Sequence, residues 1–325
     1  MSRVKRQKID EDNSKVTTKF EQLPNELIVL CLNYLTFFDL YESFFGLNQR
    51  LNQLLLSKST IYIDSIPETH FLTHCFNLSH FLSQSQNDLL ALRSYDENQF
   101  ELIMKDHLFK DKFSRLKSLT LNNIHADSIY DVIFNEEMKL YDILERLFLS
   151  EVSEKDEHGS AVNRLCNRLI SSKMKSLKYL NMSFKPYRCG CENNIQSGRD
   201  KVDLEFKRKA SISHLETLII GEIDGEKRTQ ISFAMLTDQL LPRLSKLRTL
   251  MIDSVYFKHE RKSPSPGVMK NKSILTMKNL KTVKVWINRQ DQQHKSVLED
   301  FFIKSSSSND LIVEIFCGDD ENSFE

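Results

Sequence analysis

The fold of this chain is decided by a short fragment that recurs along it. Residues 116–121 read LKSLTL and residues 144–149 read LERLFL. Four further copies keep the form L-x-x-L-x-L, with isoleucine, valine or methionine replacing some leucines: LKYLNM (177–182), LETLII (215–220), LRTLMI (247–252) and LKTVKV (280–285). Successive copies begin 28, 33, 38, 32 and 33 residues apart. Self-similarity at such a period predicts a repeat architecture, in which each copy belongs to one structural unit.

The alternation within each fragment is typical of a strand with one buried face. Stretches between the fragments indicate helices, for example at 68–82, 97–109, 161–170, 231–241 and 292–303. Weaker fragments at 61–63, 90–92 and 313–315 extend the series to about nine units. One strand and one helix cannot bury their apolar faces alone, whereas stacked units can. We therefore predict an α/β fold in which residues 59–325 form a curved β/α solenoid with a parallel concave sheet. The alternative is an ordinary α/β domain with chance leucines.

The composition limits the class of protein. The chain has 325 residues, with 45 lysines and arginines against 45 aspartates and glutamates. This balance argues against a general nucleic-acid binder, because such binding depends on excess cations facing phosphates. No apolar run approaches the roughly 20 residues that span a bilayer, and the start, MSRVKRQKIDEDNSK, is too polar for a signal peptide. We expect a cytoplasmic or nuclear protein that does not contact a membrane, with a disordered tail over residues 1–18.

Residues 20–57 have a different character from the rest. They read FEQLPNELIVLCLNYLTFFDLYESFFGLNQRLNQLLLS, and their leucines recur at helical spacing. Three short helices in about 40 residues can barely bury a core of their own. So many leucines on so small a unit indicate an apolar face that binds a partner.

This segment also carries a recognisable motif. Its landmarks are Leu23-Pro24-x-Glu26-Leu27, then Leu35, Asp39-Leu40 and Asn48-x-Arg50-Leu51. The order and spacing resemble the F-box, here assigned to residues 19–58. The family commonly has tryptophan after the arginine, where this chain has Leu51. The resemblance implies that Leu23, Pro24, Leu27, Leu35 and Leu40 bind a Skp adaptor. The alternative is a generic three-helix cap on the following domain.

The recurring fragments resemble degenerate leucine-rich repeats, with a period longer than the common 20–29 residues. An F-box followed by such repeats is similar to the substrate receptors of Skp–cullin–F-box ubiquitin ligases. The resemblance implies a Skp adaptor and a cullin complex as partners, and an unidentified protein substrate on the repeats. Catalysis would belong to other subunits, and the receptor would contribute proximity between the substrate and the conjugating enzyme.

Motifs for catalysis or cofactor binding are missing from the sequence. It contains no GxxxxGK[ST] or GxGxxG run and no nucleophile-elbow sequence. Cys189-Gly-Cys191 has no second pair nearby to complete a zinc site, and His70 and His74 lack the glutamate of H-E-x-x-H. We therefore expect a non-enzymatic chain with no cofactor and no metal.

The outward positions of the predicted strands indicate where a protein substrate would bind. In L-x-x-L-x-L, the residues between the leucines point away from the core. Several outward or flanking positions are large and apolar: Phe148, Tyr179, Ile219, Met251 and Trp286. Grouped apolar side chains on a concave face mark a binding site, so we predict a substrate site here, with Trp286 partly exposed. The alternatives are that another segment covers these residues, or that the register is shifted by one residue.

Two other functions fit the same sequence. A repeat-based interaction scaffold without a ligase role would bind partners through the repeats and would not bind an adaptor. A nucleic-acid or chromatin-associated module would use the basic tail and clusters such as residues 207–209, and its binding would fall steeply with salt.

Overall fold

A computed structural model of the chain describes residues 20–35, 37–57, 60–63, 77, 80–81, 91–94, 97–105, 113–154, 160–185, 202–207, 212–221, 229–257, 277–287, 289–306 and 310–317. No helix within these ranges is long and apolar enough to cross a membrane. The predicted disordered tail lies outside the described residues, as do His70, His74, Cys189 and Cys191. The boundary between the two predicted domains, at residues 58 and 59, stays a prediction.

Three short helices open the described chain. They are α1 (Asn25–Leu32), α2 (Phe37–Phe44) and α3 (Gln49–Leu56), preceded by a 3-10 turn, η1 (Phe20–Gln22). Pro24 stands directly before α1, and its carbonyl accepts the first helical hydrogen bond, from the Ile28 N–H at 3.1 Å. Asn48 caps α3, because its side-chain oxygen accepts from the Leu51 N–H at 2.8 Å. The core of this three-helix unit consists of Ile28, Leu32, Leu40, Leu51 and Leu55.

A parallel sheet follows the three-helix unit. Its main path consists of β1 (Thr60–Ile63), β2 (Ala91–Ser94), β3 (Ser118–Asn122), β4 (Arg146–Val152), β5 (Tyr179–Phe184), β7 (Thr217–Ile220), β9 (Thr249–Tyr256), β10 (Thr282–Ile287) and β11 (Ile312–Cys317). These strands are adjacent in that order, and each neighbouring pair is parallel. Two short strands, β6 (Val202–Asp203) and β8 (Thr229–Ser232), pair with each other, and β8 also pairs with β9. The predicted α/β class and parallel sheet are confirmed, as is the chain-order adjacency of the six fragments.

Neighbouring strands keep one register across the sheet. The fourth position of each fragment is the partner of the same position in the next, and these residues are Leu119, Leu147, Leu180, Leu218, Leu250 and Val283. Each of them is 0% exposed. Because alternate residues of a strand point to opposite faces, this alignment places the whole row on the buried side of the sheet.

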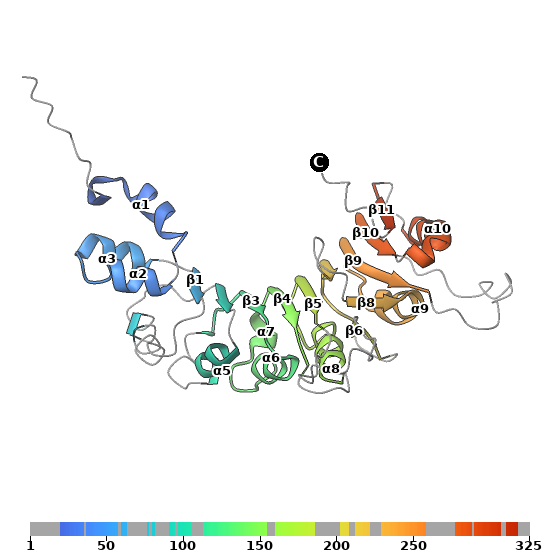
Figure 1. Cartoon of the computed structure of the whole chain (residues 1–325), viewed down its shortest axis with the longest axis horizontal. Coiled ribbons are helices and arrows are strands. Elements are labelled where there is room, and N and C mark those ends of the chain that lie inside the picture. The colour runs from blue at the N-terminus through green and yellow to red at the C-terminus, as the bar shows by residue number, and fades with distance from the viewer. Residues whose placement is uncertain are drawn as a thin grey trace, which may run out of the picture.

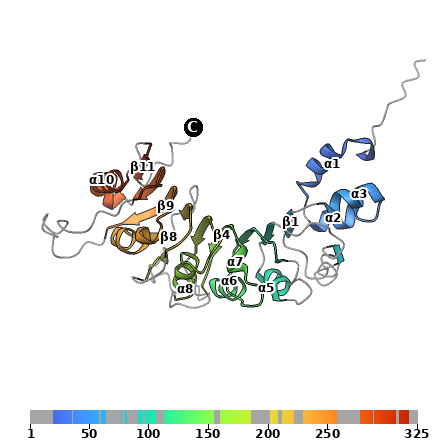
Figure 2. The ribbon, with the colours of Figure 1, turned by 180° about the vertical axis from the view of Figure 1, so that it is seen from behind.

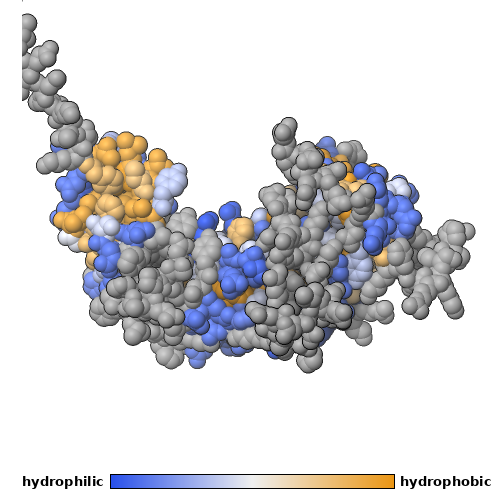
Figure 3. Space-filling model, viewed as in Figure 1, coloured by the Kyte–Doolittle hydropathy of each residue, from blue (hydrophilic) through white to orange (hydrophobic). Residues whose placement is uncertain are grey.

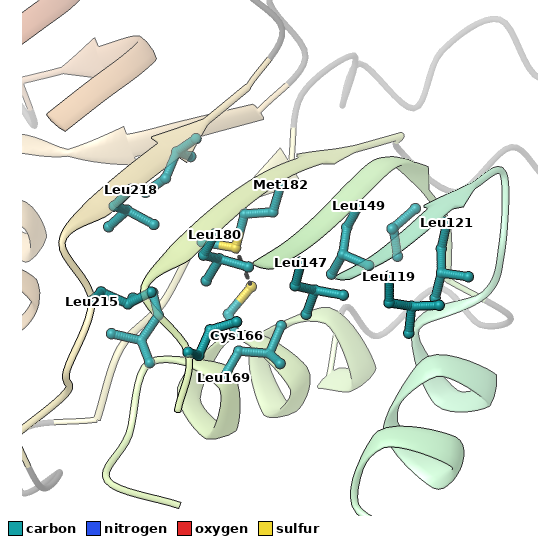
Figure 4. Close-up of a cluster of buried hydrophobic side chains, with 14 of the residues drawn as sticks. Leu119, Leu121, Leu147, Leu149, Cys166, Leu169, Leu180, Met182, Leu215 and Leu218 are labelled. Carbon is teal, nitrogen blue, oxygen red and sulfur yellow. Dashed lines mark hydrogen bonds between the residues drawn. The ribbon is translucent and has the colours of Figure 1, made fainter. Parts of the chain in front are cut away.

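Helices cover the outer side of the curved sheet. Figures 1 and 2 show α5 (Glu97–Lys105), α6 (Ala126–Ile133), α7 (Leu140–Ile143) and α8 (Ser160–Leu169) on one side, with the strands lining the inside of the arc. In Figure 4 the leucines of β3 to β5 point toward the helices beneath the sheet, and Cys166 of α8 lies below Leu180 and Met182 of β5. Its Sγ lies 3.8 Å from Met182 Sδ. Burial raises the pKa of the Cys166 thiol, so this cysteine is an unreactive core residue.

The helix predicted over 231–241 differs from the structure. Residues Thr229–Ser232 form β8, and the helix begins with α9 (Phe233–Met235). It continues as a π-helical turn, η4 (Leu236–Leu240), and a 3-10 turn, η5 (Leu241–Arg243). Pro242 explains the irregularity, because proline has no N–H to donate to the Asp238 carbonyl and its ring would clash there. Near the end of the chain, η6 (Arg289–His294) and α10 (Lys295–Ser305) cover the helix predicted over 292–303.

Candidate interaction surfaces

Arg50 holds the start of α1 against α3. Its Nη1 donates to the Glu21 carbonyl at 2.5 Å, its Nη2 to the Leu23 carbonyl at 2.7 Å, and its Nε to Asn25 Oδ1 at 2.8 Å. Asn48 adds a bond from its Nδ2 to Glu21 Oε1 at 3.1 Å. The planar guanidinium reaches three acceptors at once, which a lysine ammonium in this place would not. Two residues of the N-terminal motif therefore position the Leu23-Pro24 segment, a role that the sequence pattern did not assign.

The three-helix unit leaves a large apolar face uncovered. Its exposed members, Leu27, Leu30, Tyr34 and Leu47, are 47%, 53%, 83% and 61% exposed. Figure 3 shows apolar surface gathered over this end of the molecule. On α1 the residues Leu27 and Leu30 face outward, whereas Ile28 and Leu32 fill the core. An exposed apolar patch of this kind makes the face a candidate interaction surface.

The residues predicted to bind an adaptor divide between this face and the core. Pro24 and Leu27 are exposed, and Leu23 and Leu35 are half-buried against the core. Leu40 is buried, so its predicted role in direct contact is corrected: it anchors α2 inside the unit. Leu51 is also buried, so the departure from tryptophan at this position concerns the core. The predicted set missed Leu30, Tyr34 and Leu47, although helical spacing already aligned the first two with Leu27.

The inner face of the sheet presents its side chains in rows. One row contains the residues between the leucines: Thr120, Phe148, Asn181, Ile219, Met251 and Lys284. The adjacent row contains Ser118, Arg146, Tyr179, Thr217, Thr249 and Thr282. Since neighbouring strands lie about 4.8 Å apart, consecutive members of a row are in reach of each other. The predicted register is confirmed for Phe148, Ile219 and Met251, and Tyr179 lies one row away.

Phe148 and Tyr179 form an aromatic pair near the middle of this face. Their ring centroids are 4.7 Å apart with 35° between the planes, and both side chains are half-buried. The register partner of Tyr179 is Arg146, which is exposed. Burial raises the pKa of the Tyr179 phenol, and the charge of Arg146 acts in the opposite direction. The pair therefore offers a neutral aromatic surface beside a cationic group.

Trp286 is buried, at 8% exposed, so the prediction of a partly exposed tryptophan in the site is wrong. Its ring stacks on Phe316 of β11, with centroids 4.6 Å apart and 20° between the planes. On its other side β9 contains a bulge, which places Asp253 and Ser254 opposite Trp286. Strand alternation alone revealed neither the stacked ring nor the bulge.

The inner face becomes more polar toward the C-terminal strands. Ile219 is buried at 8% exposed, as Trp286 is, so its predicted place among the exposed substrate-binding residues is corrected; Met251 is half-buried. Beyond them, Lys284 Nζ pairs with Glu314 Oε2 at 2.7 Å, and the adjacent row consists of Thr217, Thr249 and Thr282. Of the predicted substrate-binding residues, Phe148 and Tyr179 thus lie in direct ring contact with each other, and Trp286 belongs to a separate cluster.

A polar network joins three consecutive units at the ends of β3 and β4. Ser153 Oγ lies 2.9 Å from His125 Nδ1, and His125 Nε2 lies 3.3 Å from Glu97 Oε2. Ser128 Oγ lies 2.6 Å from Glu97 Oε1 and 2.5 Å from Glu101 Oε1. The network ties α5 to α6 and to the segment after β4. Within the described residues, no group of three or more histidines, cysteines and acidic residues is arranged to hold a metal ion.

Comparisons with family models, with curated proteins and with solved structures give no match for this chain.

Proposed function

We propose that this chain is the substrate receptor of a cullin-type ubiquitin ligase. The three-helix unit binds a Skp adaptor as an F-box, and the sheet, as a leucine-rich-repeat-like solenoid, holds a protein substrate. The observation that carries the proposal is the uncovered apolar face around Leu27 and Leu30, on a unit whose motif residues Arg50 and Asn48 fix its start.

The arrangement of the two surfaces supports this division of labour. In Figure 1 the three-helix unit stands at one end of the arc, and the inner face of the sheet lies along its hollow. Binding at one surface leaves the other available. Two partners held by one chain are brought close together, which is the contribution a receptor makes to a transfer reaction between them.

The substrate side of the proposal centres on Phe148 and Tyr179. Large aromatic side chains contribute most at interfaces when a partner covers them completely. Arg146 beside the pair favours a substrate segment in which an apolar side chain lies next to an acidic one, since a guanidinium binds carboxylates in a bidentate manner. Toward β11 the corresponding groups are already engaged, because Lys284 pairs with Glu314 and Trp286 is buried against Phe316.

The test replaces the exposed face without touching the core. In the variant Leu27→Glu/Leu30→Glu the two side chains face solvent, so the fold and the unfolding midpoint should persist, while co-purification of adaptor and cullin from cells is lost. The matched control is Ile303→Glu on α10, a residue that is 62% exposed at the other end of the chain. This variant should retain both partners.

Each outcome decides between the candidate functions. Retention of the adaptor by a folded Leu27→Glu/Leu30→Glu variant contradicts the proposed docking surface. Absence of adaptor and cullin from the wild-type preparation, with other proteins captured through the sheet, favours a scaffold without a ligase role. Phe148→Ala should release the substrate and keep the adaptor, so loss of both partners would contradict the division into two surfaces.

A further inference from the structure

Arg243 is a buried, charged side chain, and two of its hydrogen-bond donors have no partner among the described residues. It ends the 3-10 turn η5 and is 3% exposed. Its Nη1 lies 3.4 Å from Asn167 Oδ1 on α8, and its guanidinium carbon lies 5.8 Å from the centre of the Phe206 ring. Among the described residues, its Nε and Nη2 have no hydrogen-bond partner.

The two unpartnered nitrogens form one edge of the guanidinium. Nε–H and the outer Nη2–H point in parallel, and this fork matches two oxygens of one carboxylate or phosphate. A buried polar group without a partner is costly, and a buried charge without a partner is costlier still. Burial lowers the pKa of Arg243, and arginine still retains its proton in proteins. The group thus stays a cation that requires acceptors.

The local backbone explains why an arginine points inward here. Pro242 interrupts regular helical hydrogen bonding, and the π-helical turn Leu236–Leu240 precedes it. A π turn contains an extra residue, which rotates the following side chains relative to a regular helix, and such turns are frequent at functional sites. Gln239 belongs to the same run, and its Oε1 is also buried without a partner among the described residues. Two unsatisfied polar side chains therefore occur within five residues.

The groups around Arg243 do not neutralise it. No carboxylate of the described residues forms an ion pair with Arg243. Its pKa is lowered by desolvation, because burial disfavours the charged form. Asn167 Oδ1 already accepts a stronger bond from the Lys207 N–H, at 2.8 Å. The nearest ring, Phe206, is buried and offers only its face.

We propose that Arg243 binds a small oxyanion through its Nε and Nη2 edge, independently of the proposed ligase function. The ligand has at least two oxygen acceptors on one centre, as phosphate and carboxylates do. Small size follows from burial, because a macromolecular surface cannot contact nitrogens enclosed in this way.

Entry of the ligand requires opening of the segment Leu204–Lys207. The N–H groups of this segment donate mostly to side chains: Glu205 to Asn163 Oδ1 at 2.9 Å, Phe206 to Met235 Sδ at 3.3 Å, and Lys207 to Asn167 Oδ1 at 2.8 Å. Leu204 N–H donates to the Gln230 carbonyl at 3.0 Å, and the Glu205 carbonyl accepts from Asn167 Nδ2 at 2.8 Å. Of these bonds, only that of Leu204 joins backbone to backbone, so this segment should open at a lower free energy than the strands of the sheet do. An anion on Arg243 would in turn stabilise the closed arrangement.

The experiment measures thermal unfolding of the full chain in phosphate, sulfate and acetate, against chloride at equal ionic strength. Phosphate should raise the midpoint saturably, since a ligand that binds the native state stabilises it. Arg243→Lys keeps the charge and removes the fork, and we expect about tenfold weaker binding. The matched control is Arg248→Met, which removes an exposed arginine that pairs with Glu216 at 3.6 Å and should leave the response unchanged.

A second measurement, on the wild-type protein, tests the proposal if the Arg243→Lys variant does not fold. The Nε–H resonance of Arg243 in the wild-type protein should move on titration with phosphate. A response to phosphate and sulfate without acetate identifies a tetrahedral oxyanion, and a response to all three includes carboxylates. No shift beyond chloride, an equal response in Arg243→Lys, or an Nε–H resonance that does not move would each overturn the proposal.

Discussion

Leucines of the three-helix unit and leucines of the sheet differ in what surrounds them. Leu27 and Leu30 face solvent over about half of their surface, whereas Leu147 and Leu180 are fully buried between strands and helices. The difference follows from size and connectivity. Three short helices enclose too little volume to bury both sides of α1, whereas β4 and β5, which contain these two sheet leucines, each have a neighbouring strand on either side. The same residue type therefore forms an exposed face, which we propose as a docking surface, in one region and a buried core in the other.

The largest effect should come from a leucine at the centre of the sheet. Leu180→Ala removes a side chain that is 0% exposed, and such truncations cost about 2–5 kcal/mol in the free energy of unfolding. Leu30→Ala, at 53% exposed, should change stability by about 0.5 kcal/mol or less. Chemical denaturation of both variants measures the contrast. Equal losses in the free energy of unfolding would contradict the comparison, because they would mean that the exposed face also stabilises the fold.

A somewhat smaller effect is expected at Trp286. Its stacking on Phe316 and its 8% exposure place it in a packed cluster, so Trp286→Ala should destabilise the chain by about 3 kcal/mol. Trp286 is the single tryptophan of the chain, and its fluorescence reports on this cluster directly. The folded protein should show blue-shifted emission that resists quenchers. Red-shifted, readily quenched emission would show that Trp286 is exposed to solvent and would contradict its place in the packed cluster.

The smallest effect concerns the helical side of the sheet. Hydrogen bonds from Tyr141 and Lys173 lower the pKa of Glu136 below its ordinary value of 4.5. A lowered pKa means that the ionised form is favoured in the folded state, so this contribution is present above pH 4.5 and is lost as the pH falls through the folded value. Glu136→Gln should therefore reduce stability at neutral pH and approach wild type in acid. An identical pH dependence of unfolding in both proteins would contradict this assignment.

The repeat fragments made much of the sheet predictable. A six-residue pattern fixed which strand residues are buried, because strand alternation and in-register stacking apply the same rule to every copy. The helix over 231–241 was less predictable, since Pro242 and the short strand β8 altered it locally. Trp286 was misplaced for a similar reason: the bulge in β9 and the ring of Phe316 arise from contacts between units. The exposed role of Leu30 and Tyr34 required knowing which side of α1 faces the other helices.

The chain-order pairing of the strands has a consequence for how the sheet comes apart. Each inner strand of the main path pairs with the strands directly before and after it, and the terminal strands β1 and β11 pair on one side only. The stability of the sheet therefore resides in nearest-neighbour interfaces. Loss of β11 leaves the other eight strands of this path paired, whereas a break at the β4–β5 interface divides the sheet. Amide hydrogens should accordingly exchange first at the terminal strands and last at the centre. The aromatic pair of Phe148 and Tyr179 bridges β4 and β5, one of the two central interfaces of this path.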